Sequence, residues 1–499
     1  MTFALKGWQG ALEQGIMKKG RKHWQVRALL AAAITGALLL SALGAQSRPW
    51  QPGEALLKAS QPLDAYRYEL VFHPEPAQLA VTLRLEVHNR SLYPYDDLLM
   101  RTYAGAFSRE ETSPAAYPEI YEDFYPQDFS QGGILVQDVL WNDSPAACDF
   151  DDTAGTLLRI PIPALAPGEA GNLTLRCVLS LPQSPGRFGY AEDVWTFGNC
   201  LPILSLRDVG GWRRDPYWPI GDPFVSQAAN YRVSLSLPDG YTLASSSPLD
   251  KNAYALRDWA LVIVKGYAVR QLRVNQVKLQ VLSKEAGNAD SILTMARKAL
   301  TFFNKTYGGY PWETLTLVET PFPLGGMEYP GLIILSDSFL RSGNPDGLEL
   351  TIAHELAHQW FYALVGSDQI NQPWQDEALS EWSVLRYVRA LYGQGAYENL
   401  KALRLDAPMR ENIRQGITPA SPLSSFHSYQ EYTSVVYGRG AAMMEAIELD
   451  TGKVDAFLRA YCERYAFSLA TRQDFEALLN RFTGRDLSPL VQDYLDTSI

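Results

Sequence analysis

The chain changes its pattern of hydrophobic and polar positions near the middle of its length. From about residue 66 to residue 270, apolar and polar residues alternate, as in "YRYELVFHPEPAQLAVTLRLEVHNRS" and in "NYRVSLSLPDGYTLASSS", which contains a Pro-Asp-Gly turn signal. Alternation with a period of two is typical of strands that bury one face. The pattern therefore predicts a large antiparallel β domain, which we place at residues 50–275.

Helical spacing begins near residue 290. "DSILTMARKALTFFNKTYGGYPW" has this spacing and ends at glycines, "TLTLVET" has the pattern of a short strand, and helical patterns dominate beyond residue 394. We therefore expect a mixed α/β domain at residues 276–447 and a short helical C-terminal segment at residues 448–499. The fold class predicted for the chain is multidomain α+β.

The N-terminal segment, residues 1–49, carries the one targeting signal. Basic residues up to Arg27 are followed by "ALLAAAITGALLLSALGA", an uncharged run at residues 28–45 that would span about 27 Å as a helix. The run is predicted to be a transmembrane anchor or, because Ala42-Leu43-Gly44 resembles a cleavage site, a signal peptide. In either case the positive-inside rule predicts that the remaining domains lie outside the cytoplasm.

The overall composition narrows the class of protein. A chain of 499 residues that is 46% hydrophobic and 20% charged can bury a large core in several domains. Its formal net charge of −11 gives no general attraction to phosphate backbones, so we expect no nucleic-acid partner. The four cysteines contain no C-x-x-C pair, which argues against a cysteine zinc site and leaves a disulfide among the first three open. These cysteines are Cys148, Cys177, Cys200 and Cys462.

The stretch "TIAHELAHQWFYALVG" contains the strongest chemical signal. On a helix, positions i and i+4 share a face, so His354 and His358 can bind one metal ion while Glu355 lies beside a water molecule. Zinc needs a third protein ligand, and Glu377, which follows after residues 359–376, can return on a second helix. This set would leave a fourth position open for water, whereas closed structural zinc sites favour cysteine. An ordinary polar helix face is the alternative.

Three motifs together resemble a known family. "HELAHQW", the glutamate within "WQDEALSE" and the upstream "GGMEYPG" look like the zinc aminopeptidases typified by alanyl aminopeptidase and leukotriene hydrolase, and most of all like their short, membrane-associated bacterial relatives. The resemblance implies a thermolysin-like catalytic domain that holds one zinc ion per chain. It makes His354, His358 and Glu377 the zinc ligands and Glu355 the general base.

The same resemblance nominates substrate-binding and oxyanion-stabilising residues. Within "GGMEY", it implies that Glu328 holds the free α-amine of the substrate and that the glycines let the backbone approach the substrate closely; a plain strand turn is the alternative. The matching residues are Gly325, Gly326, Met327 and Glu328. "SVVYGRGAAMMEA" matches the family's tyrosine, x, basic, glycine pattern and nominates Tyr437 as the oxyanion donor, with Tyr432 as a nearby competitor.

Two further carboxylates lie close to Glu377. Asp376 precedes it and Glu381 follows one turn later, so either could orient a ligand histidine from behind. It is equally consistent with the sequence that both are ordinary carboxylates on the exposed face of a helix. His73, His88 and His427 have no motif around them and are expected to lie outside the site.

Two departures from the family pattern change the expectations. Many members have a second amine-binding Gln or Glu in the β domain, and the corresponding stretch here, "YAEDVWTFGNCLP", offers only Glu192 as a weak substitute. Few residues follow Tyr437, so the long helical-repeat domain of larger relatives is not expected. A more open cleft would follow.

The function predicted from these residues is that of an extracytoplasmic, membrane-associated zinc metallopeptidase that removes N-terminal residues from peptides. Two alternatives remain. A zinc endopeptidase would share the metal and Glu355 but would cleave blocked peptides. A non-catalytic peptide-binding relative would lack part of the metal set, yet each expected residue is present.

Overall fold

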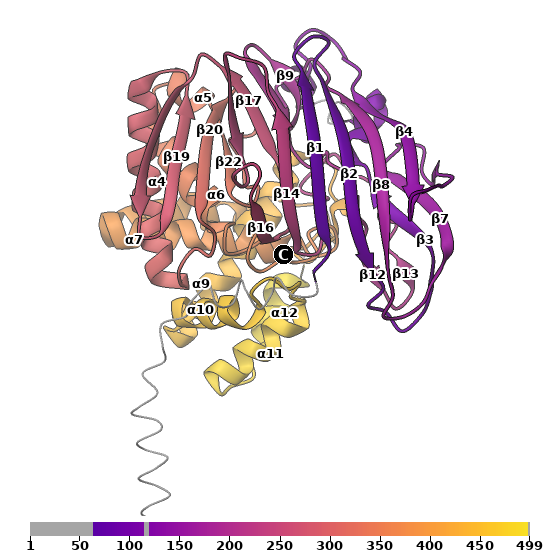
Figure 1. Cartoon of the computed structure of the whole chain (residues 1–499). Helices are drawn as coiled ribbons and strands as arrows, with labels where there is room; N and C mark the ends of the chain where they lie inside the picture. Colours follow the sequence, from indigo (N-terminus) through magenta and orange to yellow (C-terminus); the bar gives the residue numbers. More distant parts are fainter. Residues whose placement is uncertain (1–62, 114–118, 498–499) are drawn as a thin grey trace, which may run out of the picture. The chain divides into compact units, whose positions relative to one another are not determined.

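The computed structural model describes residues 63–113 and 119–497, which belong to one compact unit at Pro52–Ile499 (Figure 1). The apolar run at residues 28–45 lies outside the described residues. Within the two described ranges, no helix combines the length and the apolar character that a membrane crossing requires.

A seven-stranded sheet forms the centre of the β domain. Its strands are ordered β16-β14-β1-β2-β8-β4-β5, and Tyr66, Tyr68, Leu70 and Phe72 point from one face of β1 into the core. The neighbours are antiparallel except for β1 and β14, which pair in parallel. The bounds are β1 Ala65–His73, β2 Gln78–His88, β4 Gly133–Trp141, β5 Ser144–Pro145, β8 Ala170–Ser180, β14 Ala229–Ser236 and β16 Asn252–Leu256.

Smaller sheets complete this domain. Two of them have four strands, β15-β17-β10-β9 and β11-β3-β7-β6, and a third is the β12-β13 hairpin. Their bounds are β3 Tyr95–Arg101, β6 Asp149–Phe150, β7 Leu157–Leu165, β9 Phe188–Ala191, β10 Val194–Phe197, β11 Ile203–Leu204, β12 Arg207–Asp208, β13 Gly211–Trp212, β15 Tyr241–Ser245 and β17 Leu261–Lys265. The Pro-Asp-Gly turn connects β14 and β15, which lie in different sheets. β15 pairs with β17, whose first four residues are buried.

A five-stranded sheet, ordered β18-β19-β20-β22-β21, underlies the α/β domain. Its central strands β19, β20 and β22 pair in parallel, and most of their residues are buried. The bounds are β18 Ala268–Val274, β19 Val277–Ser283, β20 Thr314–Thr320, β21 Gly326–Met327 and β22 Leu332–Ser336. Residue 275, the predicted boundary between the β domain and the α/β domain, lies in the turn between β18 and β19.

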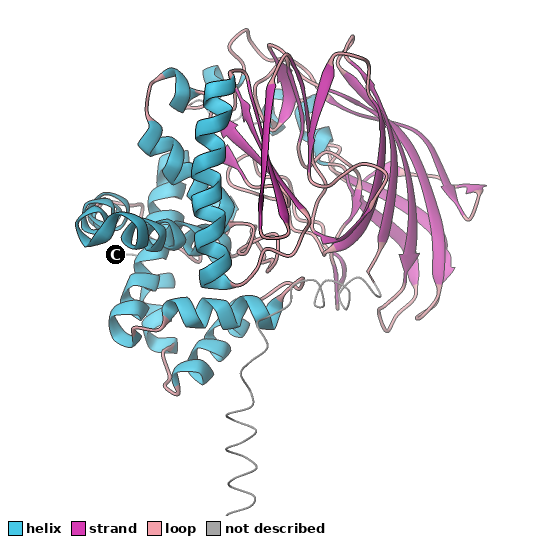
Figure 2. Cartoon of the chain, turned by 60° about the vertical axis from the view of Figure 1, so that its left-hand side comes forward, coloured by secondary structure: helices cyan, strands magenta, loops and turns pink. Residues whose placement is uncertain are grey.

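Helices gather on one side of the strands (Figure 2). The helix α4 buries Ile292, Ala296, Leu300 and Phe303 at helical spacing and ends before Gly308, whose φ is 108°. The remaining helices include those that carry the site and those of the C-terminal end. Their bounds are α3 Tyr121–Phe124, α4 Ala286–Tyr307, α5 Ser338–Arg341, α6 Pro345–Ala357, α7 Trp374–Lys401, α8 Tyr429–Tyr432, α9 Gly440–Thr451, α10 Val454–Tyr465, α11 Arg472–Thr483 and α12 Ser488–Leu495.

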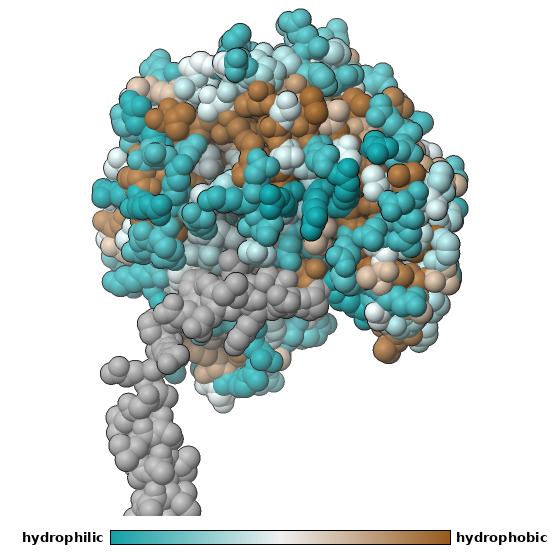
Figure 3. All heavy atoms as spheres, in the orientation of Figure 1, coloured by the Kyte–Doolittle hydropathy of each residue, from teal (hydrophilic) through white to brown (hydrophobic). Residues whose placement is uncertain are grey.

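The fold confirms the predicted class, with a β-rich N-terminal part, a mixed central sheet and a helical end. On the face shown in Figure 3, hydrophobic residues gather in a band across the upper part, and hydrophilic residues surround it. All four cysteines are free, and Cys177, Cys200 and Cys462 are buried. The disulfide that the sequence left open does not form.

Candidate metal centre and substrate pocket

The helix α6 places the two histidines. Asn344 caps its first turn by accepting a hydrogen bond from the backbone N–H of Gly347, Pro345 occupies the first helical position, and the apolar residues Leu348, Ile352 and Leu356 face the core. His354 lies in the last turn and His358 is the C-cap residue. One turn apart on the same face, their rings lie 4.8 Å from each other between centroids.

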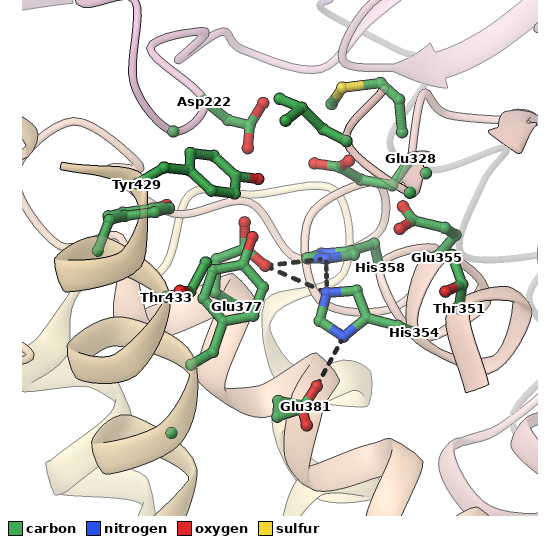
Figure 4. A pocket seen from close by; sticks show the side chains of 18 of the residues that line it. Asp222, Glu328, Thr351, His354, Glu355, His358, Glu377, Glu381, Tyr429 and Thr433 are labelled. Carbon is green, nitrogen blue, oxygen red and sulfur yellow. Dashed lines mark hydrogen bonds and ion pairs between the residues drawn. The ribbon is translucent and has the colours of Figure 1, made fainter. Parts of the chain in front are cut away.

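The helix α7 brings Glu377 to the histidines in its first turn. The three ligand atoms form a nearly equilateral triangle: His354 Nε2 lies 3.1 Å from His358 Nε2, and Glu377 Oε2 lies 3.3 Å from each nitrogen (Figure 4). These are the residues that the motif spacing predicted to meet, and all three donor atoms converge on one point. They are therefore able to hold a metal ion.

The Nδ1 atom of each imidazole, which faces away from the other two donor atoms, also has a hydrogen-bonding partner. The Nδ1 atom of His358 lies 3.2 Å from the backbone carbonyl of Phe361, and the Nδ1 atom of His354 lies 3.2 Å from a Glu381 oxygen. An N–H donated by Nδ1 leaves the Nε2 lone pair free to face a metal. Burial alone would lower the pKa of His354. The hydrogen bonds to Glu377 and Glu381 outweigh this effect and raise the pKa to about 9.

The two carboxylates beside Glu377 differ in their contacts. Asp376 accepts hydrogen bonds from the backbone N–H of Glu377 at 2.9 Å and from the Gln369 side chain at 2.6 Å, so it orders the start of α7. Glu381 instead contacts His354 directly, and its side chain is only 2% exposed. The structure therefore places Glu381, rather than Asp376, behind a candidate ligand.

Glu355 lies beside the triangle and is 6% exposed. Burial raises its pKa to about 7, against the opposing influence of His354 and His358. A Cβ atom at Gly326 would lie 2.4 Å from Glu355 Oε1, so any larger residue there would force the Glu355 side chain to shift. We expected the glycines of "GGMEY" to let backbone approach the substrate, but Gly326 packs against Glu355, while Gly325 has a φ of 90° that favours glycine.

Glu328 faces the same pocket and is 4% exposed. Its Oε1 atom has no hydrogen-bond partner among the described residues. Burial, together with the Asp222 carboxylate, raises the pKa of Glu328 well above its usual range. Met327 is buried in the hydrophobic core beside the pocket.

A glutamine connects the two motifs. The Gln359 side chain donates to the carbonyl of Tyr329 at 3.2 Å and accepts from the N–H of Gly331 at 3.0 Å. Because Gln359 follows His358 directly, it holds the "GGMEYPG" segment in place relative to the candidate ligands. The sequence analysis did not single it out.

Asp222, Arg187 and Tyr429 are among the pocket residues that the sequence analysis did not single out. Asp222 comes from the loop before β14, Arg187 from the residue before β9, and Tyr429 from α8. Arg187 donates to Asp222 at 2.7 Å, and Figure 4 shows Asp222, Glu328 and Tyr429 around one part of the pocket. Asp222 and Arg187 are far from the motifs in sequence, so no local pattern could have identified them, whereas Tyr429 lies only five residues before the segment that nominated Tyr437.

Glu192, the weak candidate for a second contact to the substrate amine, lies outside the pocket. It occupies the turn between β9 and β10, its side chain is 54% exposed, and it forms an ion pair with Lys284. Glu192 does not belong to the residues that line the pocket. The suggestion that it contacts the substrate was wrong, because the turn directs it to the surface.

Three tyrosines approach the metal ligands. The ring of Tyr437 stacks on His354, with centroids 5.5 Å apart and planes 11° from parallel. Tyr432 packs edge-on against Tyr437 at 5.7 Å, and Tyr429 lies on the adjoining turn. All three line the pocket, whose volume is 390 Å³, so Tyr437 reaches the site as predicted while Tyr432 and Tyr429 remain competitors.

The chain is similar to known peptidases in part of its sequence. Residues 292–494 match the peptidase family M1 domain. Aminopeptidase M1-B of Oryza sativa subsp. japonica is 30% identical over 217 residues, which are 40% of this chain and 24% of that protein. Aminopeptidase M1-D of the same plant is 25% identical over 326 residues, or 58% of this chain and 36% of that protein. The matched part of the chain thus spans only about a quarter to a third of these relatives.

Solved structures support the fold over a larger part of the chain. An M1 zinc metallopeptidase from Deinococcus radiodurans superposes with a TM-score of 0.59 at 16% identity, covering 88% of this chain and 95% of that one. A mutant of that enzyme bound to a Tyr-Ser-Ala substrate gives a TM-score of 0.60 at the same identity and covers 96% of that chain. At this identity the similarity concerns the fold alone.

Proposed function

We propose that this chain, a member of peptidase family M1, is a zinc-dependent aminopeptidase that hydrolyses the N-terminal residue of peptides. The observation that carries this proposal is the unpaired, buried Glu328 carboxylate beside the triangle of His354, His358 and Glu377. The triangle supplies a metal site, and the carboxylate supplies a place for a free amine.

The triangle fits zinc in chemistry and in size. Ligand atoms bound to zinc at roughly 2.0–2.1 Å in a tetrahedron lie about 3.3 Å from one another. The separations of 3.1, 3.3 and 3.3 Å among the donor atoms of His354, His358 and Glu377 match that value. Two imidazoles and one carboxylate are also a known catalytic zinc set, which leaves a fourth position open. We assign one zinc ion per chain to these residues.

Zinc, when bound, supplies a Lewis acid that activates water for attack on a carbonyl. Glu355 accepts the proton of the attacking water and returns it to the nitrogen of the leaving amine. A carboxylate with a pKa of about 7 suits both tasks, since proton transfer works best when the pKa of the group is near the working pH. Tyr437, stacked on His354, is assigned the hydrogen bond to the developing oxyanion.

The amine end of the substrate is assigned to Glu328 and Asp222. An α-ammonium group would give the unpaired Oε1 atom of Glu328 a partner and would relieve the repulsion between the two carboxylates. Arg187 holds Asp222 in place at 2.7 Å. Asp222 thus takes the second amine contact that the sequence analysis assigned weakly to Glu192.

Free and N-acetylated peptides of one sequence test the proposal. Acetylation removes the charge that Glu328 and Asp222 would bind, so the free peptide should be cleaved much faster and from its N-terminus. Glu328→Gln should narrow the difference by damaging the free substrate most, because the neutral amide cannot balance an ammonium. Equal cleavage of both peptides at internal bonds would instead identify a zinc endopeptidase.

We also propose that the run at residues 28–45 anchors the chain in a membrane, with the catalytic domain outside the cytoplasm, or releases it when cleaved. The basic residues before the run support this orientation. Protease added to intact cells should digest the domains after Arg48 if the chain is anchored. Protection until the cells are lysed would place the peptidase in the cytoplasm.

A further inference from the structure

Arg257 is a buried arginine that the proposed mechanism does not use. It directly follows β16, the edge strand of the seven-stranded sheet, and is 1% exposed. Within residues 63–113 and 119–497, its guanidinium forms no ion pair and donates only to backbone carbonyls. Burial lowers the pKa of Arg257 to about 10, so the group stays charged at neutral pH. A buried charge without a counter-ion costs stability, so packing alone would favour a neutral residue here.

The Arg257 guanidinium joins segments that are distant in the sequence. Its Nε group donates to the carbonyl of Tyr362 at 2.7 Å, and its Nη2 group donates to the carbonyls of Leu364 at 3.4 Å and Ser468 at 2.6 Å. Its Nη1 group donates to the carbonyl of Ser226 at 3.2 Å. A planar fork of five N–H groups can span these acceptors. Arg257 therefore fixes the segment that follows α6 relative to the β domain and the C-terminal helices.

The segment that follows α6 also contains the carbonyl that orients His358. The Nδ1 atom of His358 lies 3.2 Å from the carbonyl oxygen of Phe361. A carbonyl can only accept, so Nδ1 donates and Nε2 keeps the lone pair that a metal ion needs. The N–H of Ala363 donates to the His358 carbonyl at 2.9 Å and closes the turn. The direction of this imidazole thus depends on the backbone conformation of the turn.

Tyr362 connects the carbonyl at His358 with the carbonyl at Arg257. Its φ angle is 153°, in a range that residues with a side chain rarely adopt. This torsion sets the angle between the peptide plane that carries the Phe361 carbonyl and the rest of Tyr362. The hydrogen bond from Arg257 to the Tyr362 carbonyl stabilises this conformation, in which the Phe361 carbonyl faces the imidazole.

We propose that Arg257 is a positioning residue for the metal centre, which acts through Tyr362 and the Phe361 carbonyl to orient the His358 imidazole. This inference rests on the proposed function only through the zinc ion assigned to the triangle of donor atoms. Loss of the group that holds the second nitrogen of a zinc-bound histidine typically lowers metal affinity by about 10–100-fold. Because Arg257 belongs to the β domain, the packing of that domain becomes a condition for tight zinc binding.

Arg257→Lys tests the role of the guanidinium, since lysine keeps the charge but cannot span the same carbonyls. Its zinc affinity, measured by competition with a chelator, should be about 10–100-fold weaker than that of the wild-type protein. Arg101→Lys is the matched control: Arg101 is 4% exposed and donates to the carbonyls of Asp215 and Arg213, within the β domain. Thermal unfolding without zinc should show a loss of stability in both variants, but only Arg257→Lys should bind zinc more weakly.

Gly366→Ala moves the guanidinium without removing it. A Cβ atom at Gly366 would lie 2.3 Å from the Arg257 Cζ atom, so the guanidinium must shift from its carbonyl partners and zinc affinity should fall. Gly171→Ala crowds Trp141 in the β domain at 2.2 Å and should leave zinc affinity unchanged. With cobalt(II) in place of zinc, visible absorption reports the arrangement of the ligands. The spectrum should change in Gly366→Ala and Arg257→Lys and stay the same in both controls.

The wild-type protein offers a test that needs no substitution. Coupling between two sites is reciprocal, so removal of zinc should loosen the backbone that Arg257 holds. Amide hydrogen exchange should become faster at Ala363 and Gly366, whose N–H groups are hydrogen-bonded in the structure. Exchange at Ser205, which lies beside Arg101, should not change. This measurement decides the question even if the variants fail to fold.

The possible outcomes separate this inference from the proposed function. Unchanged zinc affinity in Arg257→Lys and Gly366→Ala, or exchange in the wild-type protein that ignores zinc, would overturn the role of Arg257. An equal fall in zinc affinity in Arg101→Lys would overturn it too, because any loss of packing would then weaken the site. Wild-type protein that binds no zinc would overturn both proposals. Wild-type protein that binds zinc but cleaves no peptide would overturn the aminopeptidase activity and leave the role of Arg257 to the zinc measurements.

Discussion

The Nε2 atoms of His354 and His358 lie 3.1 Å apart. Two protonated imidazoles would repel each other at this distance. Burial acts to lower the pKa of both rings, yet hydrogen bonds to Glu377 and Glu381 raise the pKa of His354, and Glu328 together with Glu377 raises the pKa of His358. A divalent ion resolves this conflict, because it replaces the protons and attracts all three donor atoms at once.

Removal of the third ligand should release the metal. Purified wild-type protein should contain one zinc per chain by elemental analysis, and Glu377→Ala should lose it because two imidazoles alone hold the ion weakly. Glu381→Gln is the control, since it keeps all three ligands and changes only the partner of His354 Nδ1. Full zinc content in Glu377→Ala would exclude Glu377 as a ligand.

The proposed base can be separated from metal binding. Glu355→Gln should keep the zinc and the fold but lose nearly all turnover, since an amide can neither accept the proton of the water nor return it. Zinc content and circular dichroism check the first part, and a peptide assay checks the second. Substantial turnover in this variant would assign the base to another group.

The pH dependence follows from the same carboxylate. Burial raises the pKa of Glu355 from its ordinary range to about 7, and the charge of a bound zinc ion would lower it. Only the deprotonated form can act as base, so kcat/KM should fall as the pH decreases through an apparent pKa at or below about 7. A limb near pH 9 would point to a different titrating group.

The three tyrosines can be ranked by removing one hydroxyl at a time. Tyr437→Phe should lower kcat by roughly 10²–10³ if its hydroxyl stabilises the oxyanion, with little change in zinc content. Tyr432→Phe and Tyr429→Phe are matched comparisons in the same pocket. If one of these two variants shows the large loss while Tyr437→Phe stays near normal, the role moves to that residue.

The contact between Gly326 and Glu355 predicts a packing effect on catalysis. Gly326→Ala places a Cβ atom 2.4 Å from Glu355 Oε1, so the carboxylate must move, and a displacement of this size can lower kcat/KM by roughly 10². Gly287→Ala is the control, because no heavy atom lies within 4 Å of its added methyl group. Unchanged activity in Gly326→Ala would show that the contact relaxes without consequence.

Much of this protein could be predicted from local spacing. The i, i+4 relation of His354 and His358 puts both on one helix face wherever that helix lies. Alternating and helical periods likewise indicated a β-rich part, a mixed part and a helical end, so the fold class is confirmed, while the domain boundaries stay a prediction. Motif resemblance indicated Glu377, Glu328 and Tyr437, and the structure brings them into one pocket.

Other features depend on how the elements pack. Asp376 and Glu381 lie on the same helix, and only the rotation of α7 against α6 places Glu381 on His354 and leaves Asp376 on the backbone. Asp222 and Arg187 arrive from loops of the β domain. A sequence period specifies which side chains share a face over a few residues. The period does not indicate which face of a distant element packs against that face, because the packing of whole sheets and helices determines this pairing.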